Sequence, residues 1–210
     1  MNGLLRKINE AFTRNKLYYL FILLFFCVGI VLGVYTIKYM NEGDKTDLSN
    51  YFTSYINSLL KNNTNYGGLF FNVLKKNLLL IIPIFLMSFL IFGAPIILIL
   101  DLIKGFSIGY TFAFLITTYS NSGIGVAFVS IIPQNLIYIP AFIILSIISL
   151  SFSIENFKSR FLKKSWNIRF NPKSDIVFLL LLFILFGIGA VIETYISPNL
   201  IRLVITKFYQ

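Results

Sequence analysis

Long apolar runs constrain this chain more strongly than any other feature of its sequence. Four blocks of the 210-residue chain are almost free of charged residues: 17–39, 77–100, 105–153 and 176–197. A helix needs about 20 residues to cross the hydrocarbon core of a bilayer. The third block is more than twice that length, and it breaks at the turn-type cluster Ser120-Asn121-Ser122-Gly123. The sequence therefore predicts an all-α integral membrane protein, a five-helix transmembrane bundle with interfacial amphipathic helices.

The predicted organisation is one membrane domain in which spans alternate with polar segments. The five predicted spans are 17–39, 77–100, 105–119, 124–153 and 176–197, of which the fourth is kinked by proline. The other segments are a basic amphipathic start at 1–16, an extracytoplasmic loop at 40–76, a basic cytoplasmic loop at 154–175 and an extracytoplasmic tail at 198–210. None of these segments is long enough to form an independent enzymatic domain.

The charge of the chain is strongly basic, with 18 lysines and arginines against 8 acidic residues. Most of the basic residues flank the predicted spans, so the positive-inside rule accounts for them and places the amino terminus in the cytoplasm. We therefore expect contacts with the anionic headgroups of cell-membrane lipids, and no binding of nucleic acid. The predicted inner-leaflet contacts are Arg6, Lys7, Arg14, Lys16, Lys163 and Lys164.

Residue types that carry much of enzyme chemistry are missing from the chain. It has no histidine, its single cysteine, Cys27, lies inside the first apolar run, and neither a P-loop nor an HExxH motif occurs. Without imidazole, the abundant serines and threonines have no histidine to activate them. We expect no catalytic residue, no metal site and no cofactor, and hence a protein that is not an enzyme.

Several segments outside the spans have apolar residues at helical spacing. In the extracytoplasmic loop, Phe52, Tyr55 and Ile56 follow this pattern, and the segment 1–16 has a similar face. Such helices either lie at the membrane interface or form docking surfaces for a partner. The tail after Pro198 is expected to lie back on the outer surface.

Glycines and charged residues interrupt the apolar runs. Gly105 and Gly109 form a small-xxx-small pair, which allows two helices to approach closely, either within one chain or between two copies in a homodimer. Asp101 and Lys104 are three residues apart, so we expect an ion pair on one helix face at the cytoplasmic interface, or a hinge between the second and third spans. Gly29 and Gly33 form a second pair in the first span.

Prolines and side-chain amides mark the predicted fourth span. Pro133 and Pro140 are two helical turns apart and each removes a backbone donor, while Gln134 and Asn135 add amides at the first kink. The amides either bond backbone carbonyls at the kink or line a substrate path through broken helices. In that alternative, the chain is a small transporter or permease-like subunit. Its cavity would be lined by Tyr110, Thr111, Gln134 and Asn135.

Glu193 is the acidic residue predicted to lie inside the membrane, about one turn from the outer end of the fifth span. An intramembrane acid is a candidate functional residue, and its predicted partners are Lys75 or Lys76. The alternative is that Glu193 hydrogen-bonds locally or reaches the interface.

Four motifs resemble those of the stage II sporulation protein M family: Arg14-Asn-Lys16 before the first span, Lys104-Gly-Phe-x-Ile-Gly-Tyr110, Pro133-Gln134-Asn135-Leu136-Ile137 with Pro140, and Ile192-Glu193 followed by Pro198. The resemblance implies a non-catalytic membrane scaffold that is required for engulfment during sporulation. It also implies that this scaffold anchors two peptidoglycan hydrolases, stage II sporulation proteins D and P, on the mother-cell side of the septum.

Overall fold

The computed structural model describes residues 16–60, 65–161 and 172–208, and every element in these ranges is helical. The elements are α2 (Lys16–Lys38), α3 (Glu42–Leu60), α4 (Tyr66–Met87), α5 (Gly93–Phe161), α6 (Pro172–Val191), the π-helical turn η1 (Ile192–Ile196) and α7 (Ser197–Phe208). Five stretches are long and apolar enough to cross a membrane: 16–38, 66–87, 93–118, 123–161 and 180–204. The predicted all-α, five-span fold class is therefore confirmed.

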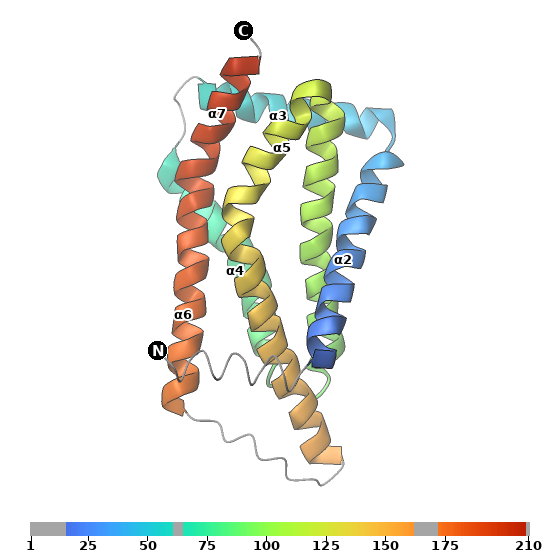
Figure 1. The fold of residues 1–210 in the computed structure, drawn as a ribbon, viewed down its shortest axis with the longest axis vertical. Helices are drawn as coiled ribbons and strands as arrows, with labels where there is room; N and C mark the ends of the chain where they lie inside the picture. Colours follow the sequence, from blue (N-terminus) through green and yellow to red (C-terminus); the bar gives the residue numbers. More distant parts are fainter. Residues whose placement is uncertain (1–15, 61–64, 162–171, 209–210) are drawn as a thin grey trace.

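The element α5 consists of two antiparallel arms, arm A (93–118) and arm B (123–161), as Figure 1 shows. The chain reverses between residues 118 and 123, at the polar cluster that the sequence marked as a turn. A side chain on Gly123 would place its Cβ 2.6 Å from the carbonyl oxygen of Leu115 and 2.8 Å from that of Ile116. Only glycine therefore allows the chain to fold back this tightly.

The turn before arm A lies at Ser88–Phe92, and not at 101–104 as predicted. The helix α4 ends at Met87, and side chains of arm B bond the turn: Ser153 Oγ donates to the Leu90 carbonyl at 2.9 Å, and Asn156 Nδ2 donates to the Ser88 carbonyl at 3.2 Å. The turn was missed because it contains Phe89, Leu90 and Phe92, so the apolar run continues through it. As a result, the predicted span 77–100 is divided between two helices.

The carboxy-terminal tail does not lie back on the outer surface. It continues the direction of α6 through η1 into α7, which packs against α5 (Figure 1). The wide turn η1 comes directly before Pro198, and the backbone N–H of Ser197 bonds the carbonyl of Ile192, five residues back. Pro198 has no N–H to donate, so a local change in hydrogen bonding lets the helix continue past it. Glu193 therefore lies in the middle of the 180–204 stretch and not near its end.

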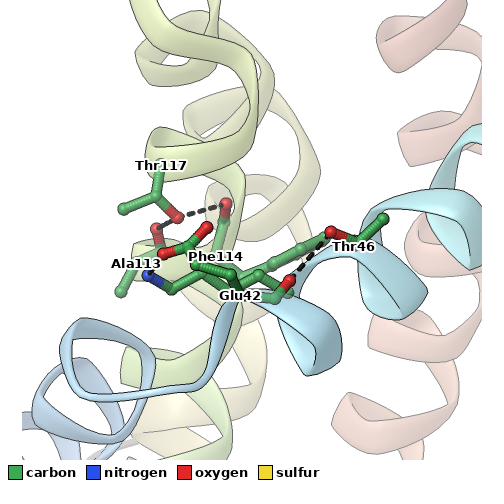
Figure 2. A network of polar contacts seen from close by, with 6 residues as sticks. Glu42, Thr46, Ala113, Phe114 and Thr117 are labelled. Atoms are coloured by element: carbon green, nitrogen blue, oxygen red, sulfur yellow. Dashed lines mark hydrogen bonds and ion pairs between the residues drawn. The ribbon is translucent and has the colours of Figure 1, made fainter.

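The helix α3 lies across one end of the bundle (Figure 1). Its start lies beside the end of arm A, as Figure 2 shows, and Phe52 packs edge-on against Phe114 with ring centroids 6.0 Å apart. Ile56 joins the buried apolar cluster at that end of the bundle. The predicted apolar face of this segment is thus turned, at Phe52 and Ile56, towards its own bundle.

The helix α2 packs on arm A through the two predicted glycine pairs. A Cβ on Gly105 would lie 2.1 Å from the Phe26 carbonyl oxygen, and one on Gly109 would lie 2.1 Å from the Ile30 carbonyl oxygen. Gly29 and Gly33 approach the backbone of arm A equally closely. The small-xxx-small pairs therefore join two helices of one chain, which was one of the two alternatives left open by the sequence.

We predict that Gly105→Ala lowers the free energy of unfolding by about 1–3 kcal/mol, because the added methyl group forces α2 away from arm A. The measurement is denaturant or thermal unfolding of the purified protein in mild detergent. Gly187→Ala is the matched control, since a Cβ at this helical glycine meets nothing within 4 Å. Equal stability of the two variants would contradict the close packing.

Candidate functional site

Four side chains from four helical segments meet inside the bundle. Asn77 comes from α4, Lys104 from arm A, Tyr138 from arm B and Glu193 from η1. We call these four side chains the mid-bundle cluster, because they lie near half the depth of the membrane. Asn77 and Lys104 each lie 11 positions after the first residue of their helix. At 1.5 Å per residue this is a depth of about 16 Å, close to the middle of a hydrocarbon core of about 30 Å.

The hydroxyl of Tyr138 is the centre of the hydrogen bonds in this cluster. It accepts a bond from Asn77 Nδ2 at 2.9 Å and forms a hydrogen bond with the Glu193 carboxylate. Asn77 Nδ2 also lies 3.5 Å from Glu193 Oε2. These contacts tie α4, arm B and η1 together, and they place hydrogen-bond donors around a carboxylate that would otherwise lie unpaired in an apolar medium.

Lys104 is held by aromatic rings and by charge. Its Nζ lies 5.2 Å from the centroid of the Tyr138 ring and 6.0 Å from that of Phe142, within the usual range of a cation–π contact. The negative charge of Glu193 attracts the ammonium group, whereas the positive charge of Lys76 repels it. Lys104 therefore lies inside the bundle, and not in a loop at the cytoplasmic interface as predicted.

Two backbone features make room for the cluster. Gly189 has no side chain where the ring of Tyr138 lies, since a Cβ there would come 2.3 Å from Tyr138 Cε1. Glu193 itself lies in the π-helical turn η1, and such turns occur frequently at functional sites. The predicted kink residues Pro133 and Pro140 lie inside arm B on either side of Tyr138.

Asp101 does not form the predicted ion pair with Lys104. Its side chain is fully buried, Oδ1 accepts a bond from Ser146 Oγ at 2.6 Å, and Oδ2 has no hydrogen-bond partner. The prediction was wrong because the turn ends at Phe92, nine residues before Asp101, which moves Asp101 from the helix end into the interior between the two arms. A buried carboxyl oxygen without a hydrogen-bond partner costs free energy in an apolar interior.

The amides of arm B bond within the bundle. Gln134 Oε1 accepts a bond from Ser197 Oγ at 2.6 Å, and Gln134 Nε2 donates to the carbonyl of Ser130 in its own helix. Asn135 Nδ2 donates to the carbonyl of Ile131 at 2.8 Å. Of the two amides, only Gln134 joins two helices in these bonds.

The other two residues of the proposed transport path also bond or stack locally. Tyr110 stacks on Phe106 of the same helix, with centroids 5.8 Å apart, and Thr111 Oγ1 donates to the Ser107 carbonyl at 2.8 Å. The polar atoms expected to line a cavity are therefore used largely within single helices.

Among the predicted lipid contacts, Lys16 is the exposed first residue of α2. Arg6, Lys7, Arg14, Lys163 and Lys164 lie outside the described residues, as does the amphipathic pattern of 1–16. The start of α2 and the end of arm B lie at the same end of the bundle (Figure 1). Within the described ranges, no three metal-ligating side chains of the His, Cys, Asp or Glu type come together.

Sequence reasoning missed Asn77, Tyr138 and Ser146. Asn77 was assigned to the boundary of a span, and Tyr138 was included in the Pro133–Pro140 motif without a role. For Ser146 the sequence did contain a signal. Its spacing from Ser149 and Ser153 places three serines on one face of arm B, and all three are buried.

This geometry defines a multi-pass helical membrane protein in which polar and ionisable side chains connect the spans at mid-depth. A family model described as Stage II sporulation protein M matches residues 22–198, which is most of the chain and includes the whole mid-bundle cluster. The chain therefore belongs to the stage II sporulation protein M family, and it is a sporulation-related membrane protein. Neither the search of curated proteins nor the search of solved structures found a match.

We predict that Tyr138→Phe lowers the free energy of unfolding by about 1–3 kcal/mol, because it leaves Asn77 and Glu193 without their shared partner. The measurement is unfolding in mild detergent. Tyr110→Phe is the control, since the ring of Tyr110 stacks on Phe106 and can do so without its hydroxyl. If the two variants have the same stability, the hydroxyl of Tyr138 does not hold the cluster together.

We predict opposite effects for the two partners of the Asp101–Ser146 bond. Asp101→Asn keeps the shape and the acceptor without the charge, so its stability should equal or exceed that of the wild type. Ser146→Ala removes the only bond to a buried carboxyl and should cost about 1–3 kcal/mol. Ser149→Ala, at a buried serine one turn away, is the control for Ser146→Ala. A strongly destabilised Asp101→Asn protein would show that the charged form is required.

Proposed function

We propose that this protein is a non-catalytic scaffold of the bacterial cell membrane that recruits or anchors peptidoglycan hydrolases during engulfment. Its partners would be stage II sporulation proteins D and P, and its place would be the mother-cell side of the septum. The single observation that carries the proposal is the family match over residues 22–198.

The arrangement of polar groups agrees with a scaffold. Tyr138, Gln134 and Asp101 bond side chains from other segments of the chain. Such bonds stabilise one arrangement of helices. The chain has no histidine and contains no P-loop or HExxH motif. A rigid bundle without its own catalytic groups could act by holding enzymes at a membrane site.

The proposed orientation places the amino terminus and the basic segments in the cytoplasm, and α3 on the outer side. Peptidoglycan hydrolases act on that outer side. The helix α3 and the end of the fifth span would therefore be the parts of the scaffold closest to them.

A transporter or permease-like subunit is the second candidate. The observation that favours it is the mid-bundle cluster itself, because charged residues at mid-depth also occur in ion and substrate pathways. The local bonding of Asn135 and Thr111 gives this candidate no further support.

Affinity purification from sporulating cells in mild detergent tests the scaffold. We predict that the two hydrolases co-purify with the tagged protein, and that deletion of the gene stalls engulfment and disperses the hydrolases over the membrane. Glu193→Gln should reduce co-purification, because it weakens the bonds that hold η1. Normal engulfment in the deletion strain would refute the proposal.

A further inference from the structure

The surface of α4 carries an unpartnered stripe of side chains with a charge in its middle. Phe71, Lys75 and Leu79 are spaced four residues apart, so they lie on one face of the helix, and all three are exposed. Ile82 and Leu86 extend the exposed apolar face towards the end of the helix. We call these five residues the α4 stripe.

The charges at this surface are unbalanced. Lys76, next to the stripe, is also exposed, and it lies close enough to Lys104 for the two positive charges to repel each other. The acid near them, Glu193, is bound by Asn77 and Tyr138. In the part of the chain that the structure describes, no acid forms an ion pair with Lys75 or Lys76.

The two lysines lie near half the depth of the membrane, where an unbalanced charge is costly. Lys75 follows the first residue of α4 by nine positions and precedes the last by 12. At 1.5 Å per residue, it lies about 14 Å from one end of the helix and about 18 Å from the other. Exposed apolar residues lie on both sides of it, which is the pattern of a helix face that meets lipid or another helix. A lysine at the centre of such a face is costly in hydrocarbon, and a counter-charge lowers that cost.

We propose that the α4 stripe binds a transmembrane helix of a partner protein, and that this helix carries a carboxylate at mid-depth which pairs with Lys75 and Lys76. The apolar residues of the stripe pack against the partner helix, and the lysines fix its depth and rotation. The inference rests on the proposed function, because a membrane-anchored partner is what the scaffold would hold.

Charge and depth favour this occupant over two others. Lipid phosphates lie at the headgroup level and not at mid-depth. A second copy of this chain lacks a suitable acid among its described side chains. Asp101 is fully buried, and Glu193 is already bound. Glu42, Asp44 and Asp47 lie on α3 at one end of the bundle, and Glu155 lies near the end of arm B, so none of them is at mid-depth.

The test uses the full-length protein, reconstituted in vesicles of phosphatidylcholine with a fluorescent label. The probes are three labelled poly-leucine helices of one length: one with a central aspartate, one with an aspartate near its end, and one with leucine only. We expect energy transfer to show that the central-aspartate helix binds roughly tenfold more tightly than the other two, as an intramembrane polar contact provides.

Variants of the two lysines show whether their charge causes the preference for the central-aspartate helix. The double variant Lys75→Leu/Lys76→Leu should bind all three helices equally, while Lys75→Arg/Lys76→Arg should bind like the wild type, which separates loss of charge from loss of fold. Lys38→Leu, at the end of α2, is the matched control and should change nothing. Equal binding of the three probes to the wild-type protein would overturn the proposal.

Two further experiments test whether a lipid or a second copy of the chain occupies the α4 stripe instead. In vesicles that contain phosphatidylglycerol as well as phosphatidylcholine, lysine-dependent enrichment of phosphatidylglycerol around the protein, without preference for the aspartate helix, would overturn the proposal in favour of a lipid. Lysine-dependent energy transfer between two copies of the chain would overturn it in favour of a dimer. No hydrolase is present in these vesicles, so this result is independent of the co-purification experiment. The proposal for the α4 stripe can therefore be refuted while the scaffold proposal stands, and the scaffold proposal can be refuted while the proposal for the stripe stands.

Discussion

A polar or charged side chain inside the bilayer must find its partner within the protein, because the hydrocarbon offers none. The bundle meets this constraint at the hydroxyl of Tyr138, which joins Asn77 of α4 to Glu193 of η1. The rest of the local structure follows from that contact. Gly189 leaves space for the ring, and the ring in turn supports the ammonium group of Lys104. Four helical segments are thus positioned relative to one another at a single level.

The glycine-based contact between α2 and arm A holds two helices together in the membrane without polar groups. Lipid is as apolar as the helix surfaces, so burial alone does not drive helices together in a membrane. Close approach of the two backbones at Gly29, Gly33, Gly105 and Gly109 provides dispersion contacts without any polar group. The two modes are complementary: close packing holds α2, and hydrogen bonds and charges connect α4, arm B and η1.

The sequence predicted the parts of this fold that depend on composition and short-range pattern. The number of spans, the reversal near Gly123 and the pairing of small residues follow from apolar runs, turn residues and spacing. The boundaries near Ser88–Phe92 did not, because the turn is apolar and its polar partners, Ser153 and Asn156, are more than 60 residues away in the chain. That one error moved Asp101 and Lys104 from the bundle interior to its edge. The cluster was missed for a different reason, since Asn77, Tyr138 and Glu193 come together only through the arrangement of three helical segments.

The central claim is that the polar side chains at mid-depth couple the helices energetically. A double-mutant cycle of Asn77→Ala and Glu193→Gln, with unfolding measured in lipid nanodiscs or mild detergent, tests it most directly. These residues lie 116 positions apart in the chain and meet only through the fold. The account predicts that the two substitutions are non-additive, with a coupling energy of about 0.5 kcal/mol or more. Additive effects would contradict it.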